Sequence, residues 1–533
     1  MNIKHSTATN DVPNSFVTQH SESVIGVLSG FDRVRLQASL RLLYQPKMML
    51  CYLSKVSVLL KDFSAFVTHW TDRVRSAAHQ LAEQNGRPLI YLQSSSERKE
   101  ALARDLARRD SIQSGLIGIW SCVEPCLTYV IKRNRDRKLL ELRLEPGKCL
   151  HYYFYHQHPI LGFMHLRLQT WFPFQVNLCL NGRHWLARQM DAAGLNYLQR
   201  ENCFPWIEDL PQAQSLAQQQ LQYHWPSLLD PLLQQCHPWA TELCRPLGLS
   251  YYWSISQSEY ATDVMFKSPQ ALAKLYPALI HHGIKHFGSL DVLRFLGHKT
   301  PACGKVNGNF TGEILSDLKH RPEGVRLKHQ ANGNTLKLYD KQGSVLRVET
   351  TLNQPRQFRV YRASERDPQG QKKWQWLRKG TGDLSRRAEI CQAANYRYLQ
   401  ALSQVGITTP LKEVAATVCS PVTRKGRRYR PLNPWSDKDG ALLELISRGQ
   451  WAINGFRNRD VRTLLYPKAS SCMQQRRYAG RVTRLLGILR AHGLIKKVSR
   501  THRYVITPQG RAITTALLAA RQANVDQLIA LAA

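Results

Sequence analysis

Residues 137–181 constrain the fold more than any other part of this 533-residue chain, because apolar and polar side chains alternate along them. The segment is rich in Tyr, Phe and Trp, and the dipeptides Pro146-Gly147 and Asn181-Gly182 are turn signals inside it and at its end. Alternation with aromatic side chains indicates strands that bury one face. The segment therefore predicts an antiparallel meander with a turn at Pro146-Gly147 and a last strand that ends at Asn181-Gly182.

Other parts of the chain have helical periodicity, with apolar residues three and four positions apart, at 63–83, 96–109, 184–193, 211–222 and 269–282. Strands and helices thus occupy separate stretches, which is typical of an α+β fold. No run of 18 or more uncharged apolar residues occurs, and the first 15 residues are polar, so we expect neither a membrane span nor a secretory signal.

A second block of short strands, at 321–362, brings together residues with phosphoryl-transfer chemistry. Asn332-Gly333-Asn334 predicts a tight turn, Lys337 and Tyr339 share one strand face, and Arg347 and Glu349 share a face of the next strand. If these faces coincide, a phenol could attack a phosphorus atom while the carboxylate holds a divalent cation and the cations balance charge. The alternative is a Tyr and an Arg–Glu pair that stabilise an exposed sheet.

Positive charge is concentrated near the C-terminus. The whole chain has 74 Lys and Arg against 38 Asp and Glu, a net charge of +36, and residues 420–515 hold 21 of the cations but only 4 of the acids. A surface this basic repels itself unless a polyanion is present, and neutralising nucleic-acid phosphates releases condensed counterions. Nucleic acid is the expected partner; an anionic membrane surface and plain solvated charge are the alternatives.

Within this basic region, residues 479–492 have helical spacing, Gly493 ends the helix, and two short strands follow around a basic tip. The segment "RVTRLLGILRAHGLIKKVSRTHRYVITPQGRAI" resembles the MarR-like winged helix-turn-helix family. By this resemblance a helix enters the major groove and a wing contacts the backbone. The resemblance assigns DNA contacts to Arg481, Arg484 and Arg490 on the helix and to Lys496, Lys497, Arg500, His502 and Arg503 at the wing. A winged helix used only for protein contacts is the alternative.

The string "LYDK…LRVE" resembles a motif of rolling-circle replication initiators and transposon nucleases. This resemblance implies that Tyr339 is the nucleophile and that Glu349, with Asp340, binds the metal. Asp32 ends an apolar run in "VIGVLSGFD", which is how a ribonuclease-H-like nuclease offers a first metal carboxylate. The strings "FMHLRLQTWFPF", "LKLYDKQGSVLRVET" and "INGFRNRD" resemble a group of uncharacterised bacterial proteins of this length.

Metal sites built from histidine or cysteine have weaker support. His156-Gln157-His158 resembles the paired histidines of rolling-circle nucleases, but a polar residue separates them and Pro159 follows. The twelve cysteines include no CxxC pair, so they indicate buried thiols of a reducing compartment. Two alternative metal sites are Cys122 with Cys126, if the two share one face of a helix, and Cys236-His237 with Cys244. No Walker or GxGxxG loop occurs, so no nucleotide or organic cofactor is expected.

These features together predict an α+β protein of mobile-element type, a transposase or replication initiator that cuts or joins double-stranded DNA with Mg²⁺ or Mn²⁺. A cytoplasmic, nucleoid-associated location is expected, and a homodimer is among the assemblies that fit. The alternatives are a non-enzymatic DNA-binding regulator and an RNA-binding protein that stacks bases on Tyr and Trp. The expected parts are a mixed helical region at 1–112, an α+β domain at 113–300, a small sheet with a helix at 301–418, a basic linker at 419–436, which includes Arg427 and Arg428, and a winged helix at 437–533.

Overall fold

The structure is a computed structural model of the chain. The residues that it describes are 15–136, 138–298, 313–321, 324–363, 367, 369–403, 411–424, 426–451, 455–467, 471–498 and 501–524. They divide into two compact units: the meander unit, residues 27–262 and 350–392, and the basic unit, residues 1–26, 263–349 and 393–533. Each unit combines segments far apart in the sequence.

The meander unit is built on a sheet whose neighbouring strands follow the order β9-β1-β6-β5-β4-β3-β2. The pairs β1–β6, β6–β5, β5–β4 and β4–β3 are antiparallel, and β2 is parallel to β3. The strands of this unit are β1 (Val24–Ser39), β2 (Leu89–Tyr91), β3 (Gly115–Asn134), β4 (Leu139–His158), β5 (Gly162–Gln169), β6 (Val176–Asn181), β7 (Tyr197–Arg200), β8 (Cys203–Ile207), β9 (Tyr252–Phe266), β14 (Arg359–Arg362) and β15 (Lys373–Trp376).

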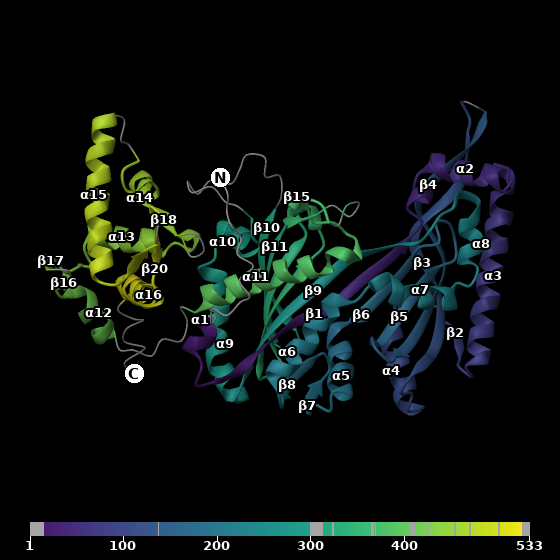
Figure 1. Ribbon diagram of the computed structural model, residues 1–533, viewed down its shortest axis with the longest axis horizontal. Coiled ribbons are helices and arrows are strands. Elements are labelled where there is room, and N and C mark those ends of the chain that lie inside the picture. The colour runs from purple at the N-terminus through teal and green to yellow at the C-terminus, as the bar shows by residue number, and fades with distance from the viewer. Residues whose placement is uncertain are drawn as a thin grey trace. The chain divides into compact units, whose positions relative to one another are not determined.

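Helices cover this sheet, and Figure 1 labels them beside the strands. Helix α4 packs Ala103 and Leu106 against Trp120 of β3, and α3 packs Phe66 on Phe172 with stacked rings. The helices of the unit are α2 (Pro46–Lys55), α3 (Phe63–Gln84), α4 (Lys99–Arg109), α5 (Gly182–Ala192), α6 (Leu210–Gln219), α7 (Trp225–Cys236), α8 (Ala240–Cys244) and the first part of α11 (Leu384–Leu402).

The longest feature of the meander unit is the hairpin of β3 and β4, two strands of 20 residues each. The sequence predicted a turn at Pro146-Gly147, and this was wrong, because β4 continues through both residues and pairs Gly147 with Cys126. Strand β5 pairs with β4 only from His151 onward, so Pro146 lies where β4 is an edge and proline is tolerated. Glycine is needed at 147, since a Cβ there would lie 2.5 Å from Oγ1 of Thr128.

The basic unit contains the sheet β10-β11-β12-β13-β9 and the chain that follows it. The two pairs β10–β11 and β11–β12 are antiparallel, and Asn332 and Gly333 form the turn before β12 with φ of 48° and 80°. The elements here are α1 (Ser15–Gln19), α9 (Pro269–Lys285), α10 (Ser289–Phe295), β10 (Ile314–Arg321), β11 (Gly324–Ala331), β12 (Asn334–Lys341), β13 (Val345–Leu352) and the rest of α11.

The C-terminal part of the basic unit has its own apolar core, which includes Leu442, Val461, Leu486 and Leu517. A three-stranded sheet in the order β18-β20-β19 lies within it. The elements are α12 (Leu411–Cys419), β16 (Val422–Arg424), β17 (Arg427–Tyr429), α13 (Asp437–Ser447), β18 (Phe456–Arg457), α14 (Asn458–Leu465), α15 (Cys472–Ala491), β19 (Ile495–Lys497), β20 (Arg503–Ile506) and α16 (Pro508–Gln522). Gly493 follows α15 with a φ of 73°, as the sequence predicted for a C-terminal glycine.

The expected mixture of helices with a large, mainly antiparallel sheet is therefore confirmed. Among the residues that the structure describes, no helix has the length and apolar character needed to cross a bilayer.

Candidate functional site

Three of the side chains singled out in the sequence meet on strands β12 and β13. The Lys337 ammonium lies 2.6 Å from one carboxylate oxygen of Glu349, and the Tyr339 hydroxyl donates to the other at 2.7 Å. Glu349 is buried, with 2% of its surface exposed, while Lys337 and Tyr339 are half-buried. The face of β12 that carries Lys337 and Tyr339 therefore lies beside the face of β13 that carries Glu349, as expected.

This arrangement keeps Glu349 ionised. Burial opposes its charge, but the Lys337 ammonium and the hydrogen bonds from Lys337 and Tyr339 outweigh burial and hold its pKa below the ordinary value. A carboxylate that stays charged and accepts the phenolic hydrogen bond is placed to take the proton of Tyr339. Glu349 is therefore the proton acceptor within hydrogen-bond reach of the Tyr339 hydroxyl.

Arg347 has a different environment from the one that the sequence suggested. Its side chain is completely buried, and its guanidinium donates two hydrogen bonds to Asp263, from Nε at 2.6 Å and from Nη2 at 2.9 Å. A two-bond ion pair of this kind fixes the orientation of both side chains. We therefore assign Arg347 to the stability of β13 and β9 rather than to contact with a substrate phosphate.

Asp340 lies on the face of β12 opposite to Lys337 and Tyr339, because side chains alternate along a strand. Its Oδ1 atom is buried and has no hydrogen-bond partner in the described part of the chain, and burial raises the pKa of its carboxyl group. Asp340 and Glu349 therefore point away from a common ligand position, which separates the two carboxylates that the sequence motif grouped as metal ligands.

Asp32, the other proposed metal ligand, lies on β1 in the meander unit and is 3% exposed. The Asn202 amide donates to both of its oxygens, at 2.8 and 3.0 Å. A carboxylate oxygen of Glu259 on β9 lies within 4.8 Å of one on Asp32. Two adjacent carboxylates are a donor set that hard divalent cations prefer, so Asp32 and Glu259 could hold Mg²⁺ or Mn²⁺. The sequence gave no signal that would pair these two.

Helix α15 is strongly basic. Its 20 residues include five arginines and no acidic residue. The exposed ones are Arg476, Arg477, Arg481 and Arg484, whereas Arg490 is half-buried. None of these five guanidinium groups forms an ion pair with a carboxylate in the part of the chain that the structure describes. The opposite side of the helix packs Val482, Leu486 and Leu489 into the core, which fixes the arginines toward solvent.

Further cations lie on the strands near this helix in the sequence. Lys496 and Lys497 on β19 and His502 before β20 are exposed, and Arg503 is half-buried. Arg500 lies outside the described residues. In the earlier hairpin, Arg427 and Arg428 on β17 are exposed, and the Arg427 guanidinium lies 5.7 Å from the centre of the Tyr429 ring. These side chains extend the basic surface beyond α15.

The paired histidines of β4 do not offer two ligand atoms to a metal. The Nδ1 atom of His158 accepts hydrogen bonds from the backbone N–H groups of Ile160 and Leu161, both at 3.1 Å. His156 is buried, and burial together with His158 lowers its pKa to about 4. His158 therefore serves a hydrogen-bonded turn after β4.

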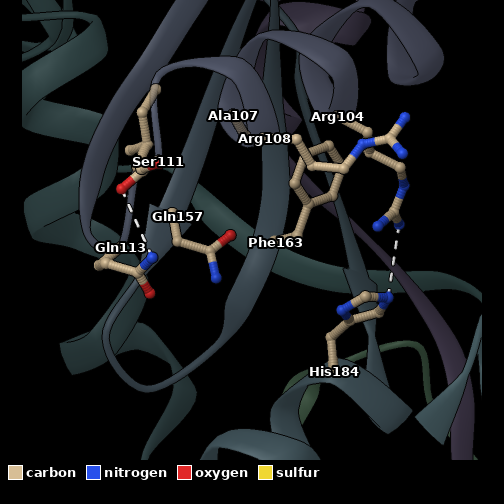
Figure 2. Close-up of a pocket in the computed structure, with 9 residues that line it drawn as sticks. Arg104, Ala107, Arg108, Ser111, Gln113, Gln157, Phe163 and His184 are labelled. Atoms are coloured by element: carbon tan, nitrogen blue, oxygen red, sulfur yellow. Dashed lines mark hydrogen bonds between the residues drawn. The ribbon is translucent and has the colours of Figure 1, made fainter.

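Sequence reasoning missed two surfaces of the meander unit. The first is a hollow of about 370 Å³ beside α4, in which the Arg104 guanidinium lies 4.1 Å from the centre of the Phe163 ring (Figure 2). His184 faces Arg104 across it, with 3.5 Å between the nitrogen atoms, and Arg108 and Gln157 also line it. Burial and Arg104 lower the pKa of His184 to about 4, so the histidine is neutral at pH 7 and the positive charge of the hollow comes from arginine.

The second surface is the hairpin of β14 and β15, where three large aromatic side chains are about half exposed: Tyr361, Trp374 and Trp376. Tyr361 and Trp374 are cross-strand partners with ring centres 5.6 Å apart, and the Arg359 guanidinium lies 4.5 Å from the Trp376 ring. In the sequence, the alternation of Trp with polar residues in "KWQW" was the signal that could have predicted this exposed aromatic strand face. Exposed rings beside cations are suited to stacking with unpaired bases.

No protein-family model, curated protein or solved structure matches this chain.

Proposed function

We propose that this chain is a DNA-binding protein of mobile-element type, and that its C-terminal part is a winged helix that binds double-stranded DNA. The proposal rests on the composition of α15. This helix has five arginines, four of which are exposed, and no acidic residue. Exposed guanidinium groups on a helix are suited to donate to phosphates and to the guanine edge.

The order of elements supports this assignment. Helices α13, α14 and α15 are followed by the strands β19 and β20, and β18 completes the small sheet. A helix of 20 residues is about 30 Å long, which is long enough to cross the major groove. In this arrangement Arg481 and Arg484 face the duplex, and Lys496 and Lys497 lead to a wing that contacts the backbone.

The second part of the proposal is DNA strand cleavage, and it rests on the hydrogen bond of 2.7 Å between Tyr339 and Glu349. The Tyr339 oxygen attacks a backbone phosphorus atom while its proton passes to the Glu349 carboxylate. The P–O bond to the neighbouring sugar breaks, and the departing oxygen takes a proton from solvent, so a phosphotyrosine ester remains. Lys337 holds Glu349 in position. Separately, Asp32 and Glu259 would hold Mg²⁺ or Mn²⁺ within the meander unit.

Cleavage is tested with supercoiled plasmid DNA and Mg²⁺ or Mn²⁺. We expect nicking together with a covalent protein–DNA adduct, and we expect both to disappear in Tyr339→Phe and to persist in Tyr361→Phe, which alters an exposed tyrosine of the β14–β15 hairpin. Binding without nicking would refute the cleavage step and leave a non-enzymatic DNA-binding regulator. Nicking that survives Tyr339→Phe but is lost in Asp32→Asn would assign the chemistry to a metal-activated water instead.

Double-stranded DNA is distinguished from RNA by competition. A labelled duplex should be displaced by unlabelled duplex DNA and much less by double-stranded RNA, since the deep, narrow major groove of A-form RNA does not admit a helix. Stronger displacement by RNA would refute the DNA assignment. The proposal extends to a nucleoid-associated location and to a homodimer on the duplex, which sedimentation of the protein–DNA complex would measure.

A further inference from the structure

Cys126, Cys149 and His151 lie together on the β3–β4 hairpin of the meander unit, and none of the three is used in the proposed function. The two sulfur atoms are 3.4 Å apart, and one ligand atom from each of the three residues lies within 4.8 Å of the others. Because Cys126 pairs with Gly147, no side chain stands across from it on β4, and its sulfur reaches diagonally to Cys149.

The histidine of this cluster is held in one tautomer. Its Nδ1 atom lies 3.0 Å from the carbonyl oxygen of Cys149, which can only accept, so Nδ1 carries the proton and donates. The Nε2 atom therefore keeps its lone pair. His151 is completely buried, and Nε2 has no hydrogen-bond partner among the described residues. A buried nitrogen lone pair without a partner is costly, unless something occupies the position in front of it.

We propose that Cys126, Cys149 and His151 bind a thiophilic divalent cation of the Zn²⁺ class, with a fourth coordination position for water. Two thiolates and one imidazole are a donor set of zinc sites. Zn–S bonds of about 2.3 Å place two sulfurs of a tetrahedral site about 3.8 Å apart, a few tenths of an ångström beyond the distance found here. Zinc-bound histidines usually donate their other ring N–H to an acceptor that fixes the ring, and the hydrogen bond from His151 to the Cys149 carbonyl is of this kind.

The burial of the cluster matches such a site. Cys149 is 8% exposed and His151 is inaccessible, but Cys126 is half-buried and gives the cation a route from solvent. All three residues are on two paired strands, so the site needs no movement of the fold. The sequence did not indicate it, because Cys126 and Cys149 are 23 positions apart and have no knuckle spacing. The sequence had instead grouped Cys126 with Cys122 on a helix as a metal alternative, and it had placed Cys149 among the buried thiols.

The experiment uses the full-length reduced chain, stripped of metal with a chelator and titrated with Co²⁺ and then with Zn²⁺ against a chromophoric chelator. We expect one equivalent of Co²⁺ to bind with a thiolate-to-metal charge-transfer band in the near ultraviolet, and Zn²⁺ to displace it. Cys126→Ser should weaken Zn²⁺ binding by more than about 100-fold, since loss of an outer partner of a ligand already costs about 10- to 100-fold. Cys179→Ser, a half-buried cysteine on β6, is the matched control and should bind like the wild type.

Circular dichroism of each variant checks that the fold is retained. If Cys149→Ser unfolds, the half-buried position of Cys126 still permits the test in Cys126→Ser alone. Equal Zn²⁺ affinity in Cys126→Ser and the wild type, or Co²⁺ binding without the charge-transfer band, would overturn the proposal. A purified chain whose Cys126 and Cys149 resist alkylation without reductant, and whose mass is lower by two hydrogens, would also overturn it, because the pair would then be a disulfide.

Discussion

The DNA-binding proposal makes a quantitative prediction for the salt dependence of binding. Each phosphate that a cation neutralises contributes about 0.9 to the slope of log K against log salt concentration. Arg481 and Arg484 are both exposed and without ion pairs in the described part of the chain, so Arg481→Ala with Arg484→Ala should lower the slope by about 1.8. Between about 50 and 200 mM salt, affinity in the double variant should then fall about 12-fold less than in the wild type.

The assay is fluorescence anisotropy of a labelled duplex at several salt concentrations. The control is Arg75→Ala with Arg143→Ala, which removes the same charge from the meander unit, where Arg75 pairs with Asp72 at 3.0 Å and Arg143 with Glu141 at 2.6 Å. Its slope should stay at the wild-type value. An unchanged slope in the α15 variant would refute the interface, and an equal change in both variants would show that only net charge matters.

Three further predictions concern stability and single strands. Asp263→Ala should lower the free energy of unfolding by about 3–5 kcal/mol in urea titration, because it leaves the Arg347 guanidinium buried without its carboxylate. Trp374→Ala with Trp376→Ala should weaken binding of a single-stranded oligonucleotide by about 1–3 kcal/mol for each base that stacks, with duplex affinity unchanged. Glu124 has a pKa of about 2: burial opposes its charge, but the Tyr153 hydroxyl and nearby cations outweigh it. Since its folded-state pKa is depressed, its stabilising contribution is present above about pH 4.5 and lost as pH falls toward 2, so Glu124→Gln should flatten acid denaturation in that range.

The sequence predicted local features well where one physical signal dominated. Alternation located the strands of 137–181, helical spacing over 479–492 located the second half of α15, and Gly493 marked its end. It failed at Pro146-Gly147, because turn propensity is a local preference and the long ladder of β3 with β4 overrides it. It also treated Cys122 and Cys126 as residues of a helix, although both lie on β3.

The candidate catalytic group was predictable in part. Spacing of two along β12 and β13 placed Lys337 and Tyr339 on one face and Glu349 on the facing strand, because side chains repeat every second residue. The partner of Arg347 was not predictable, since Asp263 is 84 positions away and is brought near only by pairing of distant strands. Proximity between Asp32 and Glu259 has the same origin. Contacts across strands distant in sequence are set by register, which no single segment encodes.

The β3–β4 hairpin has a consequence for how the chain folds. Asn134 pairs with Leu139 beside the connecting turn, and Gly115 pairs with Gln157 at the far end, so each new pair closes only a slightly longer loop than the last. Contacts between near neighbours form fast, and this ladder requires nothing beyond residue 158. The hairpin can therefore form while the ribosome is still adding β5, and β4 then offers that strand an ordered edge to pair with.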